Sequence, residues 1–341
     1  MNIRRLGALV LAGSLASGSL TMLTLGANAS AAPLTNVTFA YDFPGPDFEL
    51  VPMAVAQDQG FFTQAGLKVK VVFPPDTSTT TKLLATGAAG IGFITTTDMG
   101  VAVNAGAPVL SIGNYTMSNN WALFAKPGVS LTAKNLKSEI EGKKIFSYGD
   151  TWTESMLPFV LRHAGLTASQ VSIVTDPTGQ DLKFLLAGKV NIATNTSNYE
   201  VAGFDTSGTK GKESTLLGTA IGAPNIPIWV YATTRSYAAS NPKTVSAFMS
   251  AMEKATLWAV ANPTKAASEF DKAYPKSGYS NAYSLAGWKL TIPFMKNSAG
   301  QYFTQTNAQW TTMAKALKSI KLITSVKSPS TYYTNKFLPS S

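Results

Sequence analysis

Short apolar runs alternate with helix-like patterns along the first third of the chain. Runs rich in β-branched and aromatic residues, which are typical of buried strands, occupy positions 37–41, 67–73, 90–94 and 109–113. Between them, apolar residues recur at helical spacing over 51–59, 79–86 and 98–105. Because strands that alternate with helices are typical of βαβ units, this pattern predicts an α/β unit with a mainly parallel sheet.

A second set of the same kind begins near residue 143. Its expected strands are 144–148, 171–175 and 190–193, and its expected helices are 153–164 and 181–187. Thr151 and Glu154 fit a capping box at the start of the first of these helices. After one more expected strand at 228–233 the pattern is mostly helical. The sequence therefore predicts an α/β fold with two doubly wound lobes and a helical C-terminal tail.

The N-terminal segment has a different pattern. Arg4 and Arg5 precede an apolar stretch over 6–25, and the small residues of 27–31 contain two overlapping A-x-A sites. This pattern predicts a signal peptide over 1–31, cleaved near Ala29 to Ala32, and an exported, periplasmic protein. A membrane anchor is the alternative, and the small and polar residues that interrupt the stretch disfavour it. No cysteine follows, so we expect no lipid anchor.

Composition excludes several classes of function. The 341 residues carry 28 Lys and Arg against 18 Asp and Glu, a formal net charge of +10. The basic residues are dispersed rather than clustered, so we expect no nucleic-acid partner. Since the chain has no cysteine, disulfides, thiolate metal sites and a cysteine nucleophile are excluded.

Catalytic motifs are also lacking. The single histidine, His163, follows Arg162 on the expected flank of a helix, where we expect it to face solvent. The sequence contains no G-x-S-x-G, H-E-x-x-H or G-x-x-x-x-G-K-[ST] motif, although a Ser-Lys pair remains open because its spacing is not local. We therefore expect a protein that is not an enzyme, with no catalytic residue, metal site or cofactor.

Several segments, in order, carry a family resemblance. They are Gly60-Phe61-Phe62 with Gly66-Leu67, Pro74-Pro75-Asp76, Leu83 to Phe93, Gly106 to Val109, Leu186 to Val190, Asn198-Tyr199-Glu200 and Gly222-Ala223-Pro224. Over roughly 37–235 the chain resembles the NMT1/THI5-like branch of ABC-transporter substrate-binding proteins. That group contains binders of thiamine pyrimidine precursors, sulfonates and nitrate.

The resemblance implies a type II periplasmic-binding fold with a hinge between two lobes. Its implied division is a first lobe from 32–122 and 226–341, which includes the helical tail, and a second lobe from 123–225. A small-molecule ligand is expected in the cleft between the lobes. The resemblance further implies a membrane permease as partner and a monomeric protein.

Ligands of open α/β sheets bind beyond the carboxyl ends of the strands, where helix N-termini also point. Tyr41 ends the first expected strand, and the other candidates follow strands or belong to the resembling motifs. The expected ligand-binding residues are Tyr41, Glu49, Thr77, Ser78, Thr96, Asp98, Trp152, Glu154, Asn198, Tyr199 and Glu200. Structural alternatives exist, because Ser78 can cap a helix, Trp152 can pack beneath its loop and Glu154 can close a capping box.

The resemblance favours a thiamine pyrimidine precursor as ligand, since such binders hold a pyrimidine with aromatic rings and carboxylates. The sequence departs from that pattern at Glu49-Leu50, where the family has Asp-His, at Thr196-Ser197, and at Asn191. A sulfonate, taurine or nitrate anion bound by threonine-rich loops is therefore an alternative ligand. A thiamine-pyrimidine biosynthetic enzyme is the other alternative, which the lack of cysteine, the position of His163 and the export signal oppose.

Overall fold

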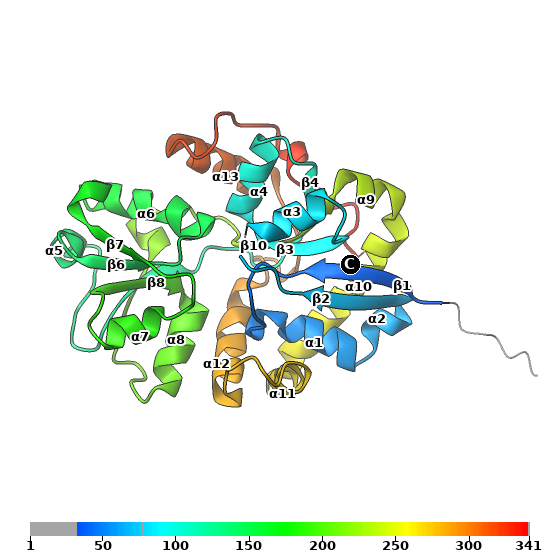
Figure 1. The fold of residues 1–341 in the computed structure, drawn as a ribbon, viewed down its shortest axis with the longest axis horizontal. Coiled ribbons are helices and arrows are strands. Elements are labelled where there is room, and N and C mark those ends of the chain that lie inside the picture. Colours follow the sequence, from blue (N-terminus) through cyan, green and yellow to red (C-terminus); the bar gives the residue numbers. More distant parts are fainter. Residues whose placement is uncertain (1–32, 77, 340–341) are drawn as a thin grey trace, which may run out of the picture. The chain divides into compact units, whose positions relative to one another are not determined.

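The computed structural model describes residues 33–76 and 78–339. The predicted signal peptide lies outside these residues, and the described chain from Leu34 onward forms one compact unit. Among the described residues there are two five-stranded sheets, each with helices on both faces (Figure 1). Four longer helices then form the C-terminal part. The predicted α/β class, with two doubly wound sheets and a helical tail, is confirmed.

The first sheet has the strand order β2-β1-β3-β10-β4. Its strands are β1 (Thr35–Ala40), β2 (Leu67–Val72), β3 (Ile91–Thr95), β4 (Val109–Asn114) and β10 (Trp229–Thr234). Strand β1 pairs in parallel with β2 and β3, whereas β10 is antiparallel to β3 and β4. The fourth position of the sheet is thus filled by a strand from late in the sequence.

The second sheet repeats this arrangement in the order β7-β6-β8-β5-β9. Its strands are β5 (Trp121–Ala125), β6 (Lys144–Ser147), β7 (Ser172–Thr175), β8 (Ile192–Thr196) and β9 (Ser214–Leu217). Here β5 is antiparallel to β8 and β9. Both sheets are therefore mixed rather than mainly parallel. The pattern analysis missed β5 because a short, continuously apolar run lacks the alternation that marks a strand.

Helices cover both faces of each sheet, and the tail adds more. The α-helices are α1 (Val51–Asp58), α2 (Phe61–Gln64), α3 (Thr79–Ala85), α4 (Thr96–Asn104), α5 (Leu136–Ile140), α6 (Thr151–His163), α7 (Asp181–Leu186), α8 (Ser197–Thr206), α9 (Arg235–Ser240), α10 (Pro242–Ala261), α11 (Pro263–Ala273), α12 (Asn281–Thr291) and α13 (Asn307–Ser319). Short 3-10 turns are η1 (Phe48–Leu50), η2 (Ala168–Gln170), η3 (Gly218–Ile221), η4 (Ile292–Phe294) and η5 (Pro329–Thr331). Within the described range, none of these helices has the length and apolar character needed to cross a membrane.

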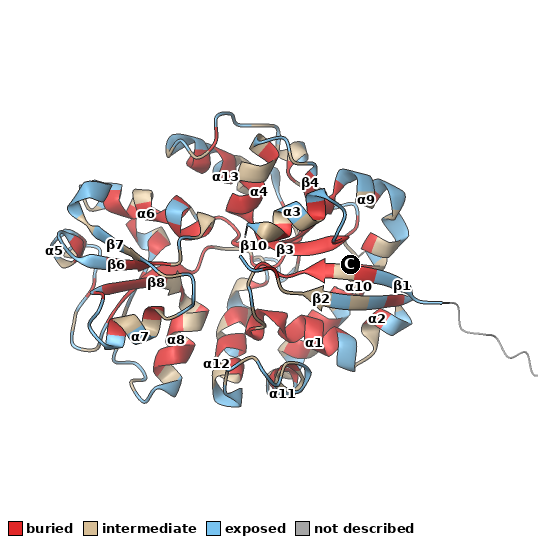
Figure 2. Cartoon of the chain, viewed as in Figure 1, coloured by how far each residue is buried: buried red, intermediate tan, exposed pale blue. Residues whose placement is uncertain are grey.

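The central strands form the core. Every residue of β3, β4 and β5 is buried, because helices lie against both faces of these strands. Figure 2 shows β3 in the colour of buried residues. Strands that are buried on both faces are expected to be continuously apolar rather than alternating. The chain follows this rule most clearly at Trp121–Ala125.

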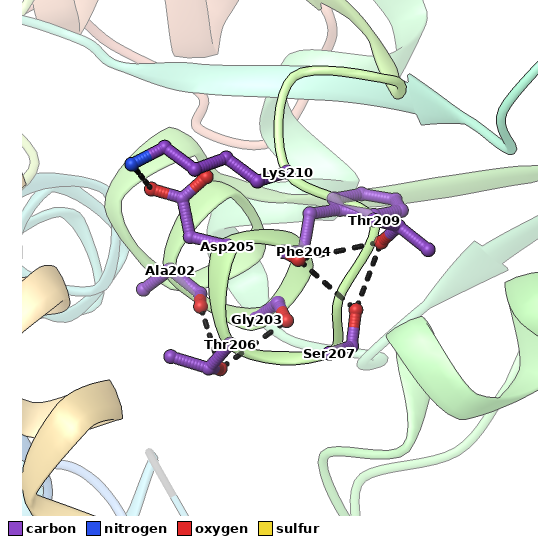
Figure 3. Close-up of polar contacts among 8 residues, drawn as sticks. All are labelled: Ala202, Gly203, Phe204, Asp205, Thr206, Ser207, Thr209 and Lys210. Atoms are coloured by element: carbon purple, nitrogen blue, oxygen red, sulfur yellow. Dashed lines mark hydrogen bonds and ion pairs between the residues drawn. The ribbon is translucent and has the colours of Figure 1, made fainter.

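The C-terminal end of α8 is held by hydroxyl groups (Figure 3). The Thr206 hydroxyl donates to the carbonyl of Ala202 at 2.8 Å, and the Ser207 and Thr209 hydroxyls donate to that of Phe204 at 3.1 and 3.3 Å. They add to the backbone N–H groups of Ser207 and Thr209, which also donate to the Phe204 carbonyl, both at 3.3 Å. They fix the end of a helix whose first turn carries Asn198, Tyr199 and Glu200, three of the expected ligand-binding residues.

Helix α12 of the tail packs against both α8 and η1. Gly287 makes this approach possible, because a Cβ at that position would collide with ring carbons of Phe48. The Phe48 ring in turn lies 4.4 Å from the ring of Tyr199 and 5.6 Å from that of Tyr283, measured between centroids. Gly287 therefore determines how closely α12 of the tail approaches Phe48 of η1 and, next to it, Tyr199 of α8.

We expect Gly287→Ala to lower the free energy of unfolding by about 1–3 kcal/mol, because the added methyl overpacks the Phe48 contact. The measurement is urea denaturation of both proteins. Gly45→Ala is the matched control, since nothing lies within 4 Å of a Cβ at that position. Equal destabilisation by the two substitutions would contradict this account of the α12 interface.

Candidate functional site

A cavity of about 680 Å³ lies among elements of both sheets and the tail. Aromatic and acidic side chains dominate its wall. The lining residues are Tyr41, Asp42, Phe43, Asp47, Tyr148, Asp150, Gly179, Asp181, Leu182, Lys183, Leu186, Ala187, Asn195, Tyr199, Glu200, Gly203, Trp229, Tyr279 and Tyr283. A cavity of this size is in the range that small-molecule sites occupy.

One wall follows β1. The Tyr41 hydroxyl donates to Asp47 Oδ1 at 2.6 Å, and the same oxygen accepts the backbone N–H of Glu49 at 2.9 Å, which caps η1. Burial raises the pKa of Asp47 to about 6, against the lowering effect of these hydrogen bonds. Burial also raises the pKa of Asp42 well above its ordinary value. The Tyr41 ring stacks on Phe93 with centroids 5.3 Å apart, so the ring is fixed before any ligand arrives.

The opposite wall is built around the Asn195 amide at the end of β8. Its Nδ2 lies 2.8 Å from the Tyr148 hydroxyl, 2.8 Å from Asp181 Oδ2 and 3.2 Å from Glu200 Oε1. The Thr196 N–H donates to Asn195 Oδ1 at 2.7 Å, which fixes the orientation of the amide. Because an amide has only two N–H donors, it cannot satisfy all three acceptors at once. Two buried carboxyl groups therefore share one neutral donor.

One carboxyl oxygen of Glu200 is free to accept a hydrogen bond. Its side chain is 2% exposed, and Oε2 has no hydrogen-bond partner among the described residues. A buried carboxylate oxygen without a partner is unfavourable by about 1–3 kcal/mol or more. This oxygen is therefore a natural acceptor for a donor group on a ligand.

Behind the cavity, Asn198 connects α8 to η1, to α12 of the tail and to the segment before β5. Its Nδ2 donates to Glu49 Oε1 at 2.7 Å and to Thr291 Oγ1 at 2.9 Å, while its Oδ1 accepts from Asn120 Nδ2 at 3.0 Å. Burial raises the pKa of Glu49 to about 8, with the charge of Asp47 adding to the shift. Glu49 therefore carries a proton over most of the neutral range.

Charge in and around the cavity is strongly unbalanced. The acidic lining residues are Asp42, Asp47, Asp150, Asp181 and Glu200. Among the lining residues that the structure describes, Lys183 is the one with a cationic side chain, and it is exposed on α7. Aromatic rings of Tyr41, Tyr199 and Trp229 lie in the same wall. Such a lining suits a planar ligand that donates hydrogen bonds or carries positive charge.

Two helix N-termini beside the cavity already have carboxylates. Asp150 is the N-cap of α6 and accepts the Thr153 N–H at 3.2 Å. Asp98 lies in the first turn of α4, where its Oδ2 accepts from Thr95 Oγ1 at 2.6 Å, and burial raises its pKa to about 6. These side chains occupy the positions where a helix dipole would otherwise attract an anion.

The expected ligand-binding residues fall into three groups. Tyr41, Tyr199 and Glu200 line the cavity, and Glu49 and Asn198 lie behind it in contact with each other. Trp152 lines a smaller neighbouring cavity. The remaining candidates that the structure describes, Ser78, Thr96, Asp98 and Glu154, are not among the residues that line the main cavity.

Local contacts explain most of this last group. Ser78 is exposed and donates to Asp76 Oδ1 at 2.7 Å, so it stabilises the turn before α3. Thr96 is buried and donates to the Pro227 carbonyl at 2.6 Å. Glu154 is exposed because α6 is capped by Asp150, which moves Glu154 beyond the capping-box position. Thr77 lies outside the described residues.

Several lining residues were not expected from the sequence. Tyr148 follows β6 as Tyr41 follows β1, so the rule that identified Tyr41 could have identified it. Asp42 and Asp47 lie in the loop after β1, where no motif marks them. Tyr279 and Tyr283 stack at 4.8 Å in the tail, which matched the resembling family only in its helical pattern.

The structure also shows where His163 lies and how the possible metal-binding side chains are arranged. His163 is exposed in the last turn of α6, as predicted, and does not line the cavity. In the described part of the chain, no group of three or more Asp, Glu or His residues is arranged to hold a metal ion.

Comparisons with known proteins agree with this architecture. The family described as NMT1/THI5 like matches residues 47–266. A Haemophilus influenzae protein named as a thiamine biosynthesis protein is 25% identical over 253 residues, which are 72% of this chain and 76% of that protein. The 4-amino-5-hydroxymethyl-2-methylpyrimidine phosphate synthase of Aspergillus parasiticus is 24% identical over 238 residues, 67% of this chain and 68% of the synthase.

A solved structure extends the likeness to the tail. The periplasmic aliphatic sulphonate binding protein of Escherichia coli superposes with a TM-score of 0.66 at 14% identity, covering 87% of this chain and 91% of that protein. At this identity the likeness concerns the fold. It confirms the expected periplasmic-binding fold.

Glu49→Gln tests the protonation of the residue behind the cavity. A pKa raised to about 8 in the folded state means that Glu49 stabilises the fold at low pH and that this stability is lost as pH rises toward and through 8. Because Gln mimics the protonated form, we expect the variant to gain stability over the wild type between pH 5 and about 9 in thermal unfolding. Glu154→Gln, at an exposed position of α6, is the matched control for the loss of a carboxyl group. A flat profile for Glu49→Gln would contradict the raised pKa.

Proposed function

The chain belongs to the NMT1/THI5-like family, and from that premise we propose that it is the extracytoplasmic solute-binding protein of an ABC importer. We propose further that its solute is a pyrimidine precursor of thiamine. The observation that carries this proposal is the cavity wall, in which buried carboxyl groups lie beside aromatic rings.

An aminopyrimidine matches the chemistry of that wall. Its exocyclic amine donates hydrogen bonds, and Glu200 Oε2 is a buried acceptor without a partner among the described residues. Its ring nitrogens accept a hydrogen bond, which the protonated Asp42 can supply because burial raises the pKa of that carboxyl well above its ordinary value. The rings of Tyr41 and Tyr199 offer flat apolar surface to the pyrimidine.

Charge argues against the sulfonate alternative. A sulfonate would bring a permanent negative charge beside Asp47, Asp181 and Glu200, and two like charges 4 Å apart repel by roughly 4 kcal/mol at an effective dielectric constant of 20. Helix N-termini could offset this repulsion only where they are free, and Asp98 and Asp150 occupy two of them. The structural likeness to a sulphonate binding protein supports a shared fold rather than a shared ligand.

Binding rather than catalysis is part of the same proposal. The Aspergillus parasiticus relative is named as a synthase, so relatedness alone leaves both activities open. The chain has no cysteine, and its one histidine is exposed at the far end of α6 from the N-terminal turn beside the cavity. What remains near the cavity are carboxyl, amide and aromatic groups, which are suited to holding a solute.

The proposal includes two lobes that close on the solute. The first comprises 32–122 and 226–341 and contains the whole first sheet, and the second comprises 123–225 and contains β6 to β9 with most of β5. Closure would bend the two segments that connect the sheets. Export through a signal peptide over 1–31, docking of the closed monomer on a membrane permease and release of the solute there complete the proposed cycle.

A thermal-shift and calorimetric comparison tests the ligand class. We expect 4-amino-5-hydroxymethyl-2-methylpyrimidine at a hundred times its Kd to stabilise the protein by about 2.7 kcal/mol, and ethanesulfonate to have no effect. Glu200→Gln should raise the Kd of the pyrimidine about 10- to 100-fold, because it replaces an oxygen that accepts a hydrogen bond by an amide group that donates one. Glu154→Gln is the exposed control. Stabilisation by ethanesulfonate alone, or an unchanged Kd in Glu200→Gln, would reject the proposed ligand.

A further inference from the structure

Charge is distributed unevenly along the chain. Residues 272–341 contain nine lysines and no arginine, and all 18 aspartate and glutamate residues lie before residue 272. Since the formal net charge of the whole chain is +10, this last segment carries almost all of it. The lysines are not adjacent in the sequence, but no acidic residue is interspersed with them. Charge asymmetry of this kind is typical of a segment that binds an anionic partner.

Three of these lysines lie at the C-terminal end of α13. Lys315 and Lys318 are one turn apart on the helix, and Lys321 follows shortly after the helix ends. All three are exposed, and none of them takes part in an ion pair among the described residues. The buried face of α13, with Met313 and Leu317, packs against α4 (Figure 1). The lysines are therefore held on a fixed helix with their charges in solvent.

The backbone of Lys321 is in an unfavourable conformation. Its φ is 64°, in the left-handed region that favours glycine, and it is one of two non-glycine residues in that region among the described residues. The Leu322 N–H donates to the Leu317 carbonyl at 2.9 Å, a bond that closes a helix end at which glycine is usual in the place of Lys321. A positive charge is thus retained where glycine would fit the backbone without strain.

The loop 322–327 that follows is fixed to the end of α4. Asn104, the last residue of α4, accepts the Thr324 N–H at 3.1 Å and donates from Nδ2 to the Ser325 carbonyl at 2.9 Å. Directly after these bonds the Val326 side chain is 39% exposed. The loop therefore presents an apolar side chain to solvent in the same short segment as the exposed lysines.

Helix ends explain only part of this positive charge. A cation near a helix C-terminus is favourable, and two lysines occupy such positions: Lys318 lies in the last turn of α13, and Lys327 Nζ donates to the Val103 carbonyl of α4 at 2.6 Å. Lys315 lies before the last turn, and the helix end at Lys321 favours glycine. These two lysines point to a role for positive charge beyond the helix ends.

The chemistry of this surface indicates its partner. We call the three exposed lysines and the loop after them the lysine tip (Lys315, Lys318, Lys321 and residues 322–327). A lysine acts as a point charge on a flexible stem, whereas a site for a single phosphate favours the planar fork of arginine, which residues 272–341 lack. A bilayer surface instead presents many anionic headgroups in a plane, and lysines beside an exposed apolar side chain suit such a surface.

We propose that the lysine tip binds the surface of a membrane that contains anionic phospholipids. This proposal is independent of the solute that the cavity holds. It assigns a role to the part of the chain that carries the positive charge, whereas the cavity wall is acidic.

Sedimentation with lipid vesicles tests the proposal. The protein is residues 32–341, which contain the whole compact unit and lack the apolar stretch 6–25. We expect it to bind vesicles of equal parts phosphatidylglycerol and phosphatidylcholine at about 50 mM NaCl, and to be released at about 500 mM because salt screens the charges. Equal binding to phosphatidylcholine alone, binding that salt does not weaken, or binding to heparin without binding to vesicles would overturn the membrane proposal.

Charge removal at the lysine tip gives a second test. Combined Lys315→Gln, Lys318→Gln and Lys321→Gln should weaken vesicle binding roughly 100-fold, since each lysine near an anionic surface contributes about fivefold. The matched control is combined Lys134→Gln, Lys137→Gln and Lys212→Gln, which removes the same charge from exposed positions outside 272–341. The control should weaken binding less than about fivefold. Equal losses in the two variants would show a response to net charge alone and would overturn the assignment to the lysine tip.

Lys321→Gly separates charge from folding. Because glycine adopts a φ of 64° without strain, we expect this variant to unfold at a temperature no lower than that of the wild type. It should nevertheless bind the anionic vesicles about fivefold more weakly, while Lys321→Arg should bind them as the wild type does. Wild-type vesicle binding by Lys321→Gly would overturn the proposed role of Lys321.

Discussion

The structure depends on an exchange of strands between its two sheets. Strand β10 completes the first sheet and β5 completes the second, and each runs antiparallel to its neighbours. The segments that lead into these strands are hydrogen-bonded to each other, since Asn119 N–H donates to Asn225 Oδ1 and Ile228 N–H donates to Thr116 Oγ1, both at 3.0 Å. This double connection keeps the carboxyl ends of β1 and β6 directed at one cavity, which is why Tyr41 and Tyr148 both line it.

The acidic side chains of the cavity wall, which no ion pair among the described residues neutralises, determine which solutes the cavity favours. The ion pairs in the described part of the chain, Lys210 with Asp205 and Lys272 with Asp58, lie outside the cavity wall. Buried carboxyl groups near the cavity are instead held by hydroxyls, amides and protons, as the raised pKa values of Asp47 and Glu49 indicate. Neutral donors leave acceptor capacity free, so a solute that supplies donors or positive charge gains more there than an anion would.

The periodicity of apolar residues predicted the α/β fold class and most helices and strands, because βαβ units have a strong local sequence pattern. It missed β5 and β9, whose places in the second sheet depend on partners distant in sequence. For the site, strand ends and family motifs pointed to Tyr41, Tyr199 and Glu200. Tyr283 could not be found in this way, since it reaches the cavity only because Gly287 lets α12 approach Phe48. Ser78 and Glu154 were expected on similar grounds but are exposed and do not line the cavity, because a position near a helix start does not determine which way its side chain points.

The late position of β10 also bears on how the chain folds. In the first sheet β10 separates β3 from β4, so these two strands, close in sequence, are joined only by residues 229–234. Such non-local pairing carries a large loop-closure entropy and slows folding. During synthesis the first sheet therefore stays incomplete until more than two thirds of the chain has been made. A nascent chain with this topology remains open to chaperones and to translocation for most of its elongation.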